Sequence, residues 1–164
     1  MEYIVDVPYI QQPDQRTCWN ASYKMMLKYK NKDESIADSL PNDAKMRDRG
    51  ILDSELSVCR DKVGLTSSMF KVFKTPQELK ERLEWYGPIW CSGFWADDHK
   101  HIVVIRGISI PWYSSSSDVT NWQVYVNDPF RKLAGAAGKP SWWSFTRFAY
   151  KLNEVPFCCQ HWSA

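Results

Sequence analysis

Apolar residues recur at helical spacing early in this chain. In the segment CWNASYKMMLKYK, residues 18–30, one face of the expected helix carries Cys18, Ala21, Met25 and Tyr29. Thr17 or Asp14, just before the periodic residues, would cap it. We therefore predict a helix that begins at Cys18.

Two further helices follow a polar stretch. Residues 31–50 are polar, and DSELSVCRDKVG then predicts a helix that ends at Gly64. The segment KTPQELKERLEWYG has Thr75 at the N-cap, Pro76 at the first helical position and Gly87 after the end. The first half of the chain is therefore mostly helical.

The pattern changes after this third helix. The runs PIWCSGFW, HIVVIRGISI and NWQVYVNDP are rich in β-branched and aromatic residues and are bounded by Gly, Pro, Ser or Asn, which is typical of consecutive antiparallel strands. The opening YIVDVPYI alternates like a short strand, and SSSSD, residues 114–118, predicts a loop between two strands. Helices followed by a sheet indicate an α+β fold.

Length and composition narrow the function classes. The 164 residues fit a single domain, residues 1–164, with one core. The aromatic content of 15%, with 9 Trp, is high, so we expect rings to fill that core and to line a groove. The formal net charge is +2, with Lys and Arg scattered among Asp and Glu, which gives no case for nucleic-acid binding.

The N-terminus and the cysteines bear on the compartment. MEYIVDVPYI lacks the features of a signal peptide, and no run reaches the roughly 18 apolar residues of a membrane span, so we expect a soluble protein that does not bind membranes. The five cysteines are odd in number, which excludes a full disulfide framework and favours a reducing compartment. Cys158, Cys159 and His161 lack the ligand spacing of a zinc site, so we predict no metal.

Cys18 lies where the first helix is expected to begin. Unpaired N–H groups and the positive end of the helix dipole favour a thiolate there, and the thiolate is the form of cysteine that attacks carbonyl groups. The alternative is a small apolar residue that fills the core, because free cysteine is among the most buried residue types. Residues elsewhere in the chain bear on this choice.

Three polar residues outside the helix would complete a nucleophilic site. Gln12, six residues before Cys18, would donate with the Cys18 N–H to an oxyanion. His101 opens an apolar strand that would present its ring as a base, with His99 in the same loop as its rival. Asp128 ends the next strand, and a hairpin of antiparallel strands would bring it to the histidine to orient the ring. Each also has a structural interpretation: a solvated loop glutamine, a strand-end histidine and an aspartate in the turn sequence NDP.

The order of these motifs resembles that of the papain-like cysteine proteases. The shared features are Q-x5-C-W with a helix after the cysteine, YGPIW at a strand start, HIVVIRGI and VNDP, and they span Val7 to Pro129 with a looser match over residues 31–74. The similarity is closest to small bacterial branches, namely effector proteases injected into other cells and double-glycine leader peptidases. Papain itself has an asparagine where this chain has Asp128, which follows the bacterial branches, and papain's disulfides are not expected.

The resemblance implies a fold and a mechanism. A helical lobe led by the cysteine helix would pack against an antiparallel sheet that carries the histidine, with the site in the groove between them. Cys18 would be the nucleophile and His101 the general base and acid. Asp128 would orient the histidine, and Gln12 would donate to the oxyanion. Such a site cleaves a protein or peptide through a thioester acyl-enzyme, without a metal or organic cofactor.

The resemblance also implies a biological role, beside which other classes stay open. A bacterial toxin delivered into the cytoplasm of a target cell, held in check in its producer by a separate immunity protein, would fit the bare chain. However, the same Cys-His-Asp set serves amidases that cut peptidoglycan peptides and acyl or glutaminyl transferases. A binding module would use the same residues only structurally.

Aromatic residues near the expected site predict what the groove accepts. Trp19 follows the nucleophile directly, Trp90 and Trp95 lie in or beside the strand before His101, and Trp142 and Trp143 lie beyond Asp128. The alternative is that most of these rings belong to the core, which is least expected for Trp19. If Trp19 and Trp95 contact substrate, the groove is narrow and excludes side chains beside the scissile bond, whereas glycine lets the substrate backbone approach closely. We therefore expect small residues, glycine above all, just before the cut.

Overall fold

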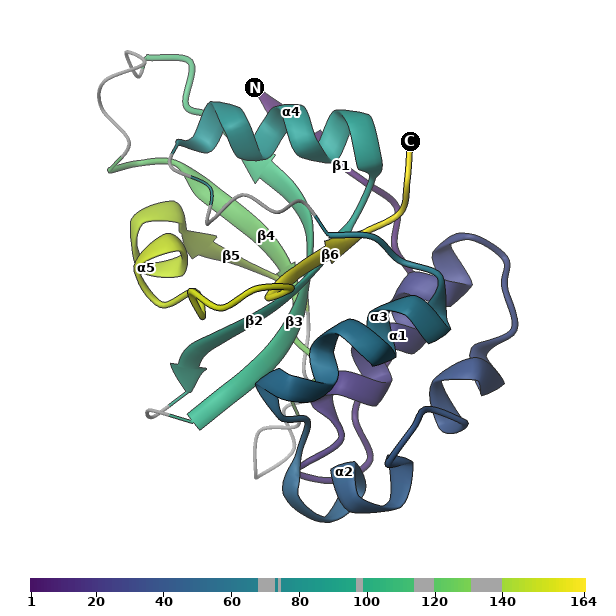
Figure 1. The fold of residues 1–164 in the computed structure, drawn as a ribbon. Helices are drawn as coiled ribbons and strands as arrows, with labels where there is room; N and C mark the ends of the chain where they lie inside the picture. The colour runs from purple at the N-terminus through teal and green to yellow at the C-terminus, as the bar shows by residue number, and fades with distance from the viewer. Residues whose placement is uncertain (68–72, 74, 97–98, 114–119, 131–139) are drawn as a thin grey trace.

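The first helix begins at the predicted cysteine. A computed structural model describes residues 1–67, 73, 75–96, 99–113, 120–130 and 140–164 (Figure 1). In it α1 spans Cys18–Tyr29, and most of its side chains are buried. The polar stretch that follows contains a 3₁₀ helix, η1 (Glu34–Asp38), and the helix α2 (Asp43–Arg49), neither of which was predicted. Both are short and polar, so they carry too few apolar residues to show a period.

The two other predicted helices are confirmed. The 3₁₀ helix η2 (Asp53–Glu55) leads into α3 (Leu56–Val63). Helix α4 spans Pro76–Tyr86, and the hydroxyl of its N-cap Thr75 accepts a hydrogen bond of 3.2 Å from the N–H of Glu78. The capping signal in the sequence therefore predicted both ends of α4 to within a residue.

Strand β3 lies at the centre of a six-stranded sheet. The strands are β1 (Glu2–Ile4), β2 (Ile89–Ala96), β3 (His99–Ser109), β4 (Gln123–Asn127), β5 (Ser141–Ser144) and β6 (Cys159–His161). Their spatial order is β5–β4–β3–β2–β6, with β1 also paired to β3, and all pairings are antiparallel. The central position predicted for the HIVVIRGISI strand is confirmed, and so is the α+β fold. Nothing in the sequence pattern had indicated β5, β6 or helix α5 (Phe145–Tyr150).

Helices cover both faces of this sheet (Figure 1). Helix α1 packs on β3 and β2, and its apolar face shares a core with Ile102 and Val104. Helices α4 and α5 share a second core with Val103 and Ile105. Successive residues of β3 thus enter different cores, which explains why the strand is apolar at nearly every position. The predicted Ser-rich loop lies outside the described residues.

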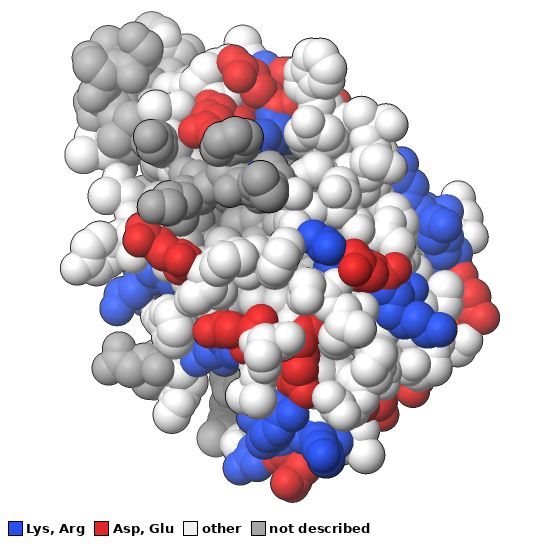
Figure 2. Space-filling view, in the orientation of Figure 1, with Lys and Arg blue, Asp and Glu red and all other residues white. Residues whose placement is uncertain are grey.

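On the face seen in Figure 2, Lys and Arg are mixed with Asp and Glu. None of the described helices is both long and apolar enough to cross a bilayer. All five cysteines are free and buried, and the sulfur atoms of Cys91 and Cys159 lie 3.5 Å apart. The described part of the chain contains no cluster of three or more His, Cys, Asp or Glu arranged to hold a metal.

Candidate active site

Cys18 is the first residue of α1 and is 8% exposed. Thr17 occupies the N-cap position, as predicted, but its side chain makes no capping hydrogen bond. Its hydroxyl donates instead to the carbonyl of Asp14 (3.3 Å). The carboxylate of Asp14 accepts from the N–H of Arg16 (3.0 Å). With no described side chain capping the first turn, its N–H groups remain beside the thiol, where they can receive an anion.

The β3–β4 hairpin brings His101 and Asp128 together as predicted. Val104 pairs with Asn127 in the ladder, so the start of β3 lies beside the end of β4. Nε2 of His101 and Oδ1 of Asp128 are 2.7 Å apart. The same carboxylate oxygen accepts a hydrogen bond of 2.9 Å from the N–H of Phe130. The carboxylate of Asp128 therefore bonds to the imidazole and to a backbone N–H, and the two bonds fix its position.

The other side of the imidazole meets the thiol. His101 interacts with both Asp128 and Cys18, and because Nε2 faces the carboxylate, Nδ1 is the nitrogen available to the sulfur. Burial lowers the pKa of His101, but the hydrogen bonds and charges of Asp128 and Cys18 outweigh it and raise the pKa to about 10. The site therefore favours the imidazolium form of His101. The rival His99 is exposed at the start of β3, and His161 is buried in β6.

Gln12 is buried in the loop before α1, with 2% of its surface exposed. Its Nε2 donates to the carbonyl of Asp14 (2.5 Å), which leaves the second hydrogen of the amide for another acceptor. Its Oε1 has no hydrogen-bond partner among the described residues. The backbone N–H of Gln12 donates to the carbonyl of Pro129 (2.9 Å), so this loop is fastened to the residue that follows Asp128.

The two tryptophans predicted to wall the groove lie in different surroundings. Trp19 is 0% exposed inside the core of α1, with the guanidinium of Arg47 5.7 Å from its ring, so this position does not support a role as a groove wall. Trp95 is half-buried and stacks on Phe148, with ring centroids 5.1 Å apart. Its ring also covers Gly93, where an added Cβ would lie 2.4 Å away.

Gly93 is the cross-strand partner of His101 in the β2–β3 ladder. Neighbouring strands lie about 5 Å apart. The ring of Trp95, which covers Gly93, therefore lies about that far from the backbone of His101. This placement keeps Trp95 as a candidate for contact with substrate.

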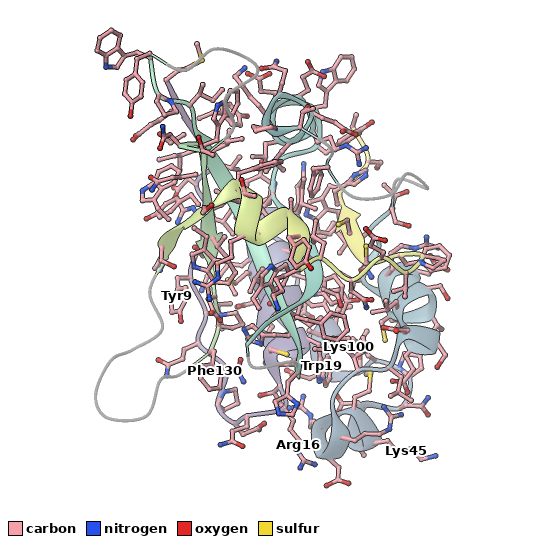
Figure 3. The ribbon with its side chains drawn as sticks, turned by 90° about the vertical axis from the view of Figure 1, so that its left-hand side faces the viewer. Tyr9, Arg16, Trp19, Lys45, Lys100 and Phe130 are labelled. Atoms are coloured by element: carbon pink, nitrogen blue, oxygen red, sulfur yellow. The ribbon has the colours of Figure 1, made fainter. Side chains whose placement is uncertain are left out.

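Two aromatic residues at the site had not been singled out from the sequence. The ring of Phe130 meets His101 edge to face, with centroids 6.0 Å apart. The hydroxyl of Tyr9 donates to the backbone carbonyl of Asp128 (2.9 Å). Figure 3 shows both residues on the left-hand side of the view. Phe130 follows the turn sequence NDP and so lies close to Asp128 in the chain. No sequence pattern near Tyr9 indicates a contact with residue 128.

Comparisons with known proteins agree with this fold. A solved structure of a double-glycine motif protease from an AMS/PCAT transporter, in complex with the leader peptide, matches with a TM-score of 0.52 and 19% identity, over 96% of this chain and 91% of that one. No curated protein matches the sequence. The family model described as "Papain-like cysteine protease AvrRpt2" matches residues 1–151. This chain therefore belongs to the AvrRpt2 family of papain-like cysteine proteases.

Proposed function

We propose that this protease cleaves a protein or peptide amide through a thioester on Cys18, with His101 and Asp128 as its catalytic partners. The observation that carries the proposal is the line of contacts from the thiol through the imidazole to the carboxylate, in which Nε2 of His101 lies 2.7 Å from Asp128. A nucleophile, a base in contact with it and an acid that orients the base are the parts that acyl transfer requires.

In the first step the thiolate attacks the carbonyl carbon of the scissile amide, and a carbon–sulfur bond forms. The carbonyl oxygen becomes an anion that accepts hydrogen bonds from the N–H of Cys18 and from the side-chain amide of Gln12. The carbon–nitrogen bond then breaks, and the imidazolium of His101 gives its proton to the leaving amine. The amine half of the substrate departs, and the other half stays as a thioester.

In the second step water completes the reaction. His101, now neutral, takes a proton from a water molecule whose oxygen attacks the thioester carbon. The carbon–sulfur bond breaks, the carboxylic acid leaves, and the thiolate and imidazolium are restored. Asp128 holds the imidazole through Nε2 in both steps, so the ring need not turn between them. The side chains of this site handle every proton and electron pair, so the mechanism requires no cofactor.

The substrate that fits best is a peptide with glycine before the cut. The structurally similar double-glycine motif protease was solved in complex with the leader peptide, which supports a peptide substrate with small residues. In this chain the ring of Trp95 covers Gly93, the strand partner of His101, which supports a restriction of the groove by this residue. A peptide library with Gly, Ala, Phe or Arg before the scissile bond tests this preference. Equal cleavage of the Phe and Arg members would contradict it.

The experiment that tests the chemistry compares two proteins in a whole-cell lysate. Wild type and Cys18→Ala are incubated side by side, and new N-termini are labelled and identified by mass spectrometry. We expect a set of new termini with wild type alone. The free and buried Cys59 supplies the matched control, because Cys59→Ala also removes one thiol but should leave the same termini. No difference between wild type and Cys18→Ala would contradict the proposal.

The proposed biological role is that of a bacterial effector or toxin that acts inside a target cell. The AvrRpt2 family description supports it, and a dedicated immunity protein would be the partner in the producing cell. Induced expression tests the role: wild type should arrest growth of a susceptible host cell, and Cys18→Ala should not. Equal growth with both, in a host whose proteins the enzyme cleaves in lysate, would separate protease activity from toxicity.

A further inference from the structure

The segment ahead of the cysteine helix is attached to the end of β4 at successive points. We call residues 5–12 the N-terminal strap. Val7 accepts a hydrogen bond from Asn127 Nδ2 (3.3 Å), Tyr9 donates its hydroxyl to the carbonyl of Asp128 (2.9 Å), and Gln12 donates its N–H to the carbonyl of Pro129 (2.9 Å). The strap therefore contacts three consecutive residues, 127–129, and the middle one is the proposed acid.

The end of β4 needs such a support. The described ladder between β3 and β4 ends at Asn127, so Asp128 lies just beyond the last strand pair. Pro129 follows, and it has no N–H to donate. Burial without a partner would be costly for the carbonyls of residues 128 and 129, and the strap supplies a donor to each.

We propose that Tyr9 is a positioning residue, whose hydroxyl holds the backbone of Asp128 so that its carboxylate meets Nε2 of His101 at 2.7 Å. The inference rests on the proposed function, because it assigns Tyr9 to the same triad. Tyr9 touches neither the thiol nor the imidazole in any described contact, so it acts on His101 only through Asp128.

The hydroxyl suits this task because it stays protonated. Tyr9 is partly buried, and burial together with the charge of Asp128 raises its pKa to about 12. It therefore remains a hydrogen-bond donor over the whole range in which the site would work. The groups that act on the pKa of His101 are Asp128, from the end of β4, and Cys18, from α1. The neighbouring Lys100 is turned to Asp53, with Nζ and Oδ1 3.0 Å apart.

The test replaces one hydroxyl and uses a second tyrosine as its matched control. Tyr9→Phe removes the bond to Asp128 and keeps the ring. Tyr3→Phe removes a similar bond, from the hydroxyl of Tyr3 to the carbonyl of Leu83 (3.3 Å), away from the triad. Both variants are titrated by NMR of the histidine rings, with His101 assigned from the signal that disappears in His101→Gln. Turnover is then measured on the best peptide from the library.

Loosening Asp128 should weaken its hold on the imidazolium. In Tyr9→Phe we expect the titration midpoint of His101 to move by at least about half a pH unit towards the ordinary 6.5, with kcat about 3- to 10-fold lower and KM nearly unchanged. Tyr3→Phe should match wild type in all three quantities. A folded Tyr9→Phe protein that titrates and turns over like wild type would overturn the proposal, as would equal shifts in both variants.

The NMR measurement needs no substrate, so it separates the two ideas. A midpoint shift confined to Tyr9→Phe, in a protein that cleaves no peptide even as wild type, would defeat the proposed function and leave the positioning role standing. If wild type and Tyr9→Phe cleave the peptide equally and their His101 midpoints agree, the positioning role of Tyr9 is defeated and the proposed function stands.

Discussion

Single residues decide the chemistry of this site, and their removal should show which act as a unit. Cys18→Ala and His101→Ala should each lower kcat by several orders of magnitude, because members of one catalytic set fail together rather than additively. Asp128→Ala should be milder, because it removes the orientation of the base but not the base. Steady-state kinetics on one peptide, with circular dichroism to verify folding, measures this. Equal activity in all three variants would refute the triad.

Gln12 presents a separate case because its proposed role is confined to the oxyanion. Gln12→Ala should lower kcat by about 10²-fold, the usual loss for one oxyanion donor. Since the backbone bond from Gln12 to Pro129 does not involve the side chain, the strap should stay in place. Gln12→Glu is the informative companion, because a carboxylate of the same size cannot donate when ionised. A rise in KM with kcat unchanged would show that the side chain only binds substrate.

The sequence predicted the positions of Cys18, His101 and Asp128 for a physical reason. Each lies at the start or end of a helix or strand, where local patterns of apolar residues change visibly. Tyr9 has no such pattern, because its partner lies 119 residues away and the bond uses a backbone carbonyl. The burial of Trp19 was missed for a related reason, since the helices that enclose it include the polar α2.

Among the elements, α4 offers the clearest test of a local signal. Thr75→Ala removes the side chain that accepts from the N–H of Glu78 and should lower the free energy of unfolding by about 1 kcal/mol. Urea denaturation measures the change. Thr75→Ser keeps the hydroxyl and should recover most of the loss. If Thr75→Ser and Thr75→Ala lower the free energy of unfolding equally, the methyl group of Thr75 stabilises the protein by packing, and its hydroxyl cap contributes little.

Other elements could be recognised only in three dimensions. Strand β6 has three residues and pairs with β2, nearly 70 positions earlier in the chain. Strand β5 has four residues and takes its place only through its register with β4. So short a run has no period of its own, and long-range pairing decides its structure. Helices α1, α3 and α4 and the three long strands β2, β3 and β4 were predictable because each has several turns or alternations.

At the scale of the whole molecule, two histidines should set opposite limits on stability with pH. Burial lowers the pKa of His161. The hydrogen bond to the carbonyl of Trp162 raises this pKa and the charge of Arg82 lowers it, and the net result is a lowered pKa. The folded protein therefore prefers this ring neutral, so its contribution is present above the unfolded value of about 6.5 and is lost as pH falls through the lower folded value. His101, raised to about 10, contributes fully below about 6.5 and loses that contribution as pH rises through 10.

Unfolding by urea at several pH values tests both limits. We expect the free energy of unfolding of wild type to be greatest near neutrality. His161→Gln should flatten the decline on the acid side, and His101→Gln the decline on the alkaline side. Because the two rings lie in different elements, the double variant should show both changes together. If the free energy of unfolding of His161→Gln falls at acid pH as steeply as that of wild type, the decline at acid pH comes from carboxylates instead.

The strap also has a consequence for when activity first exists. Gln12 and Cys18 leave the ribosome early. Their partners, Pro129 just after β4 and His101 near the start of β3, are made about 80 to 120 positions later. An incomplete or unfolded chain carries the thiol without its imidazole, and long-range contacts of this kind form late in folding. Such a chain can therefore be made without carrying out the proposed cleavage. The fold itself delays that activity until the chain is complete and folded.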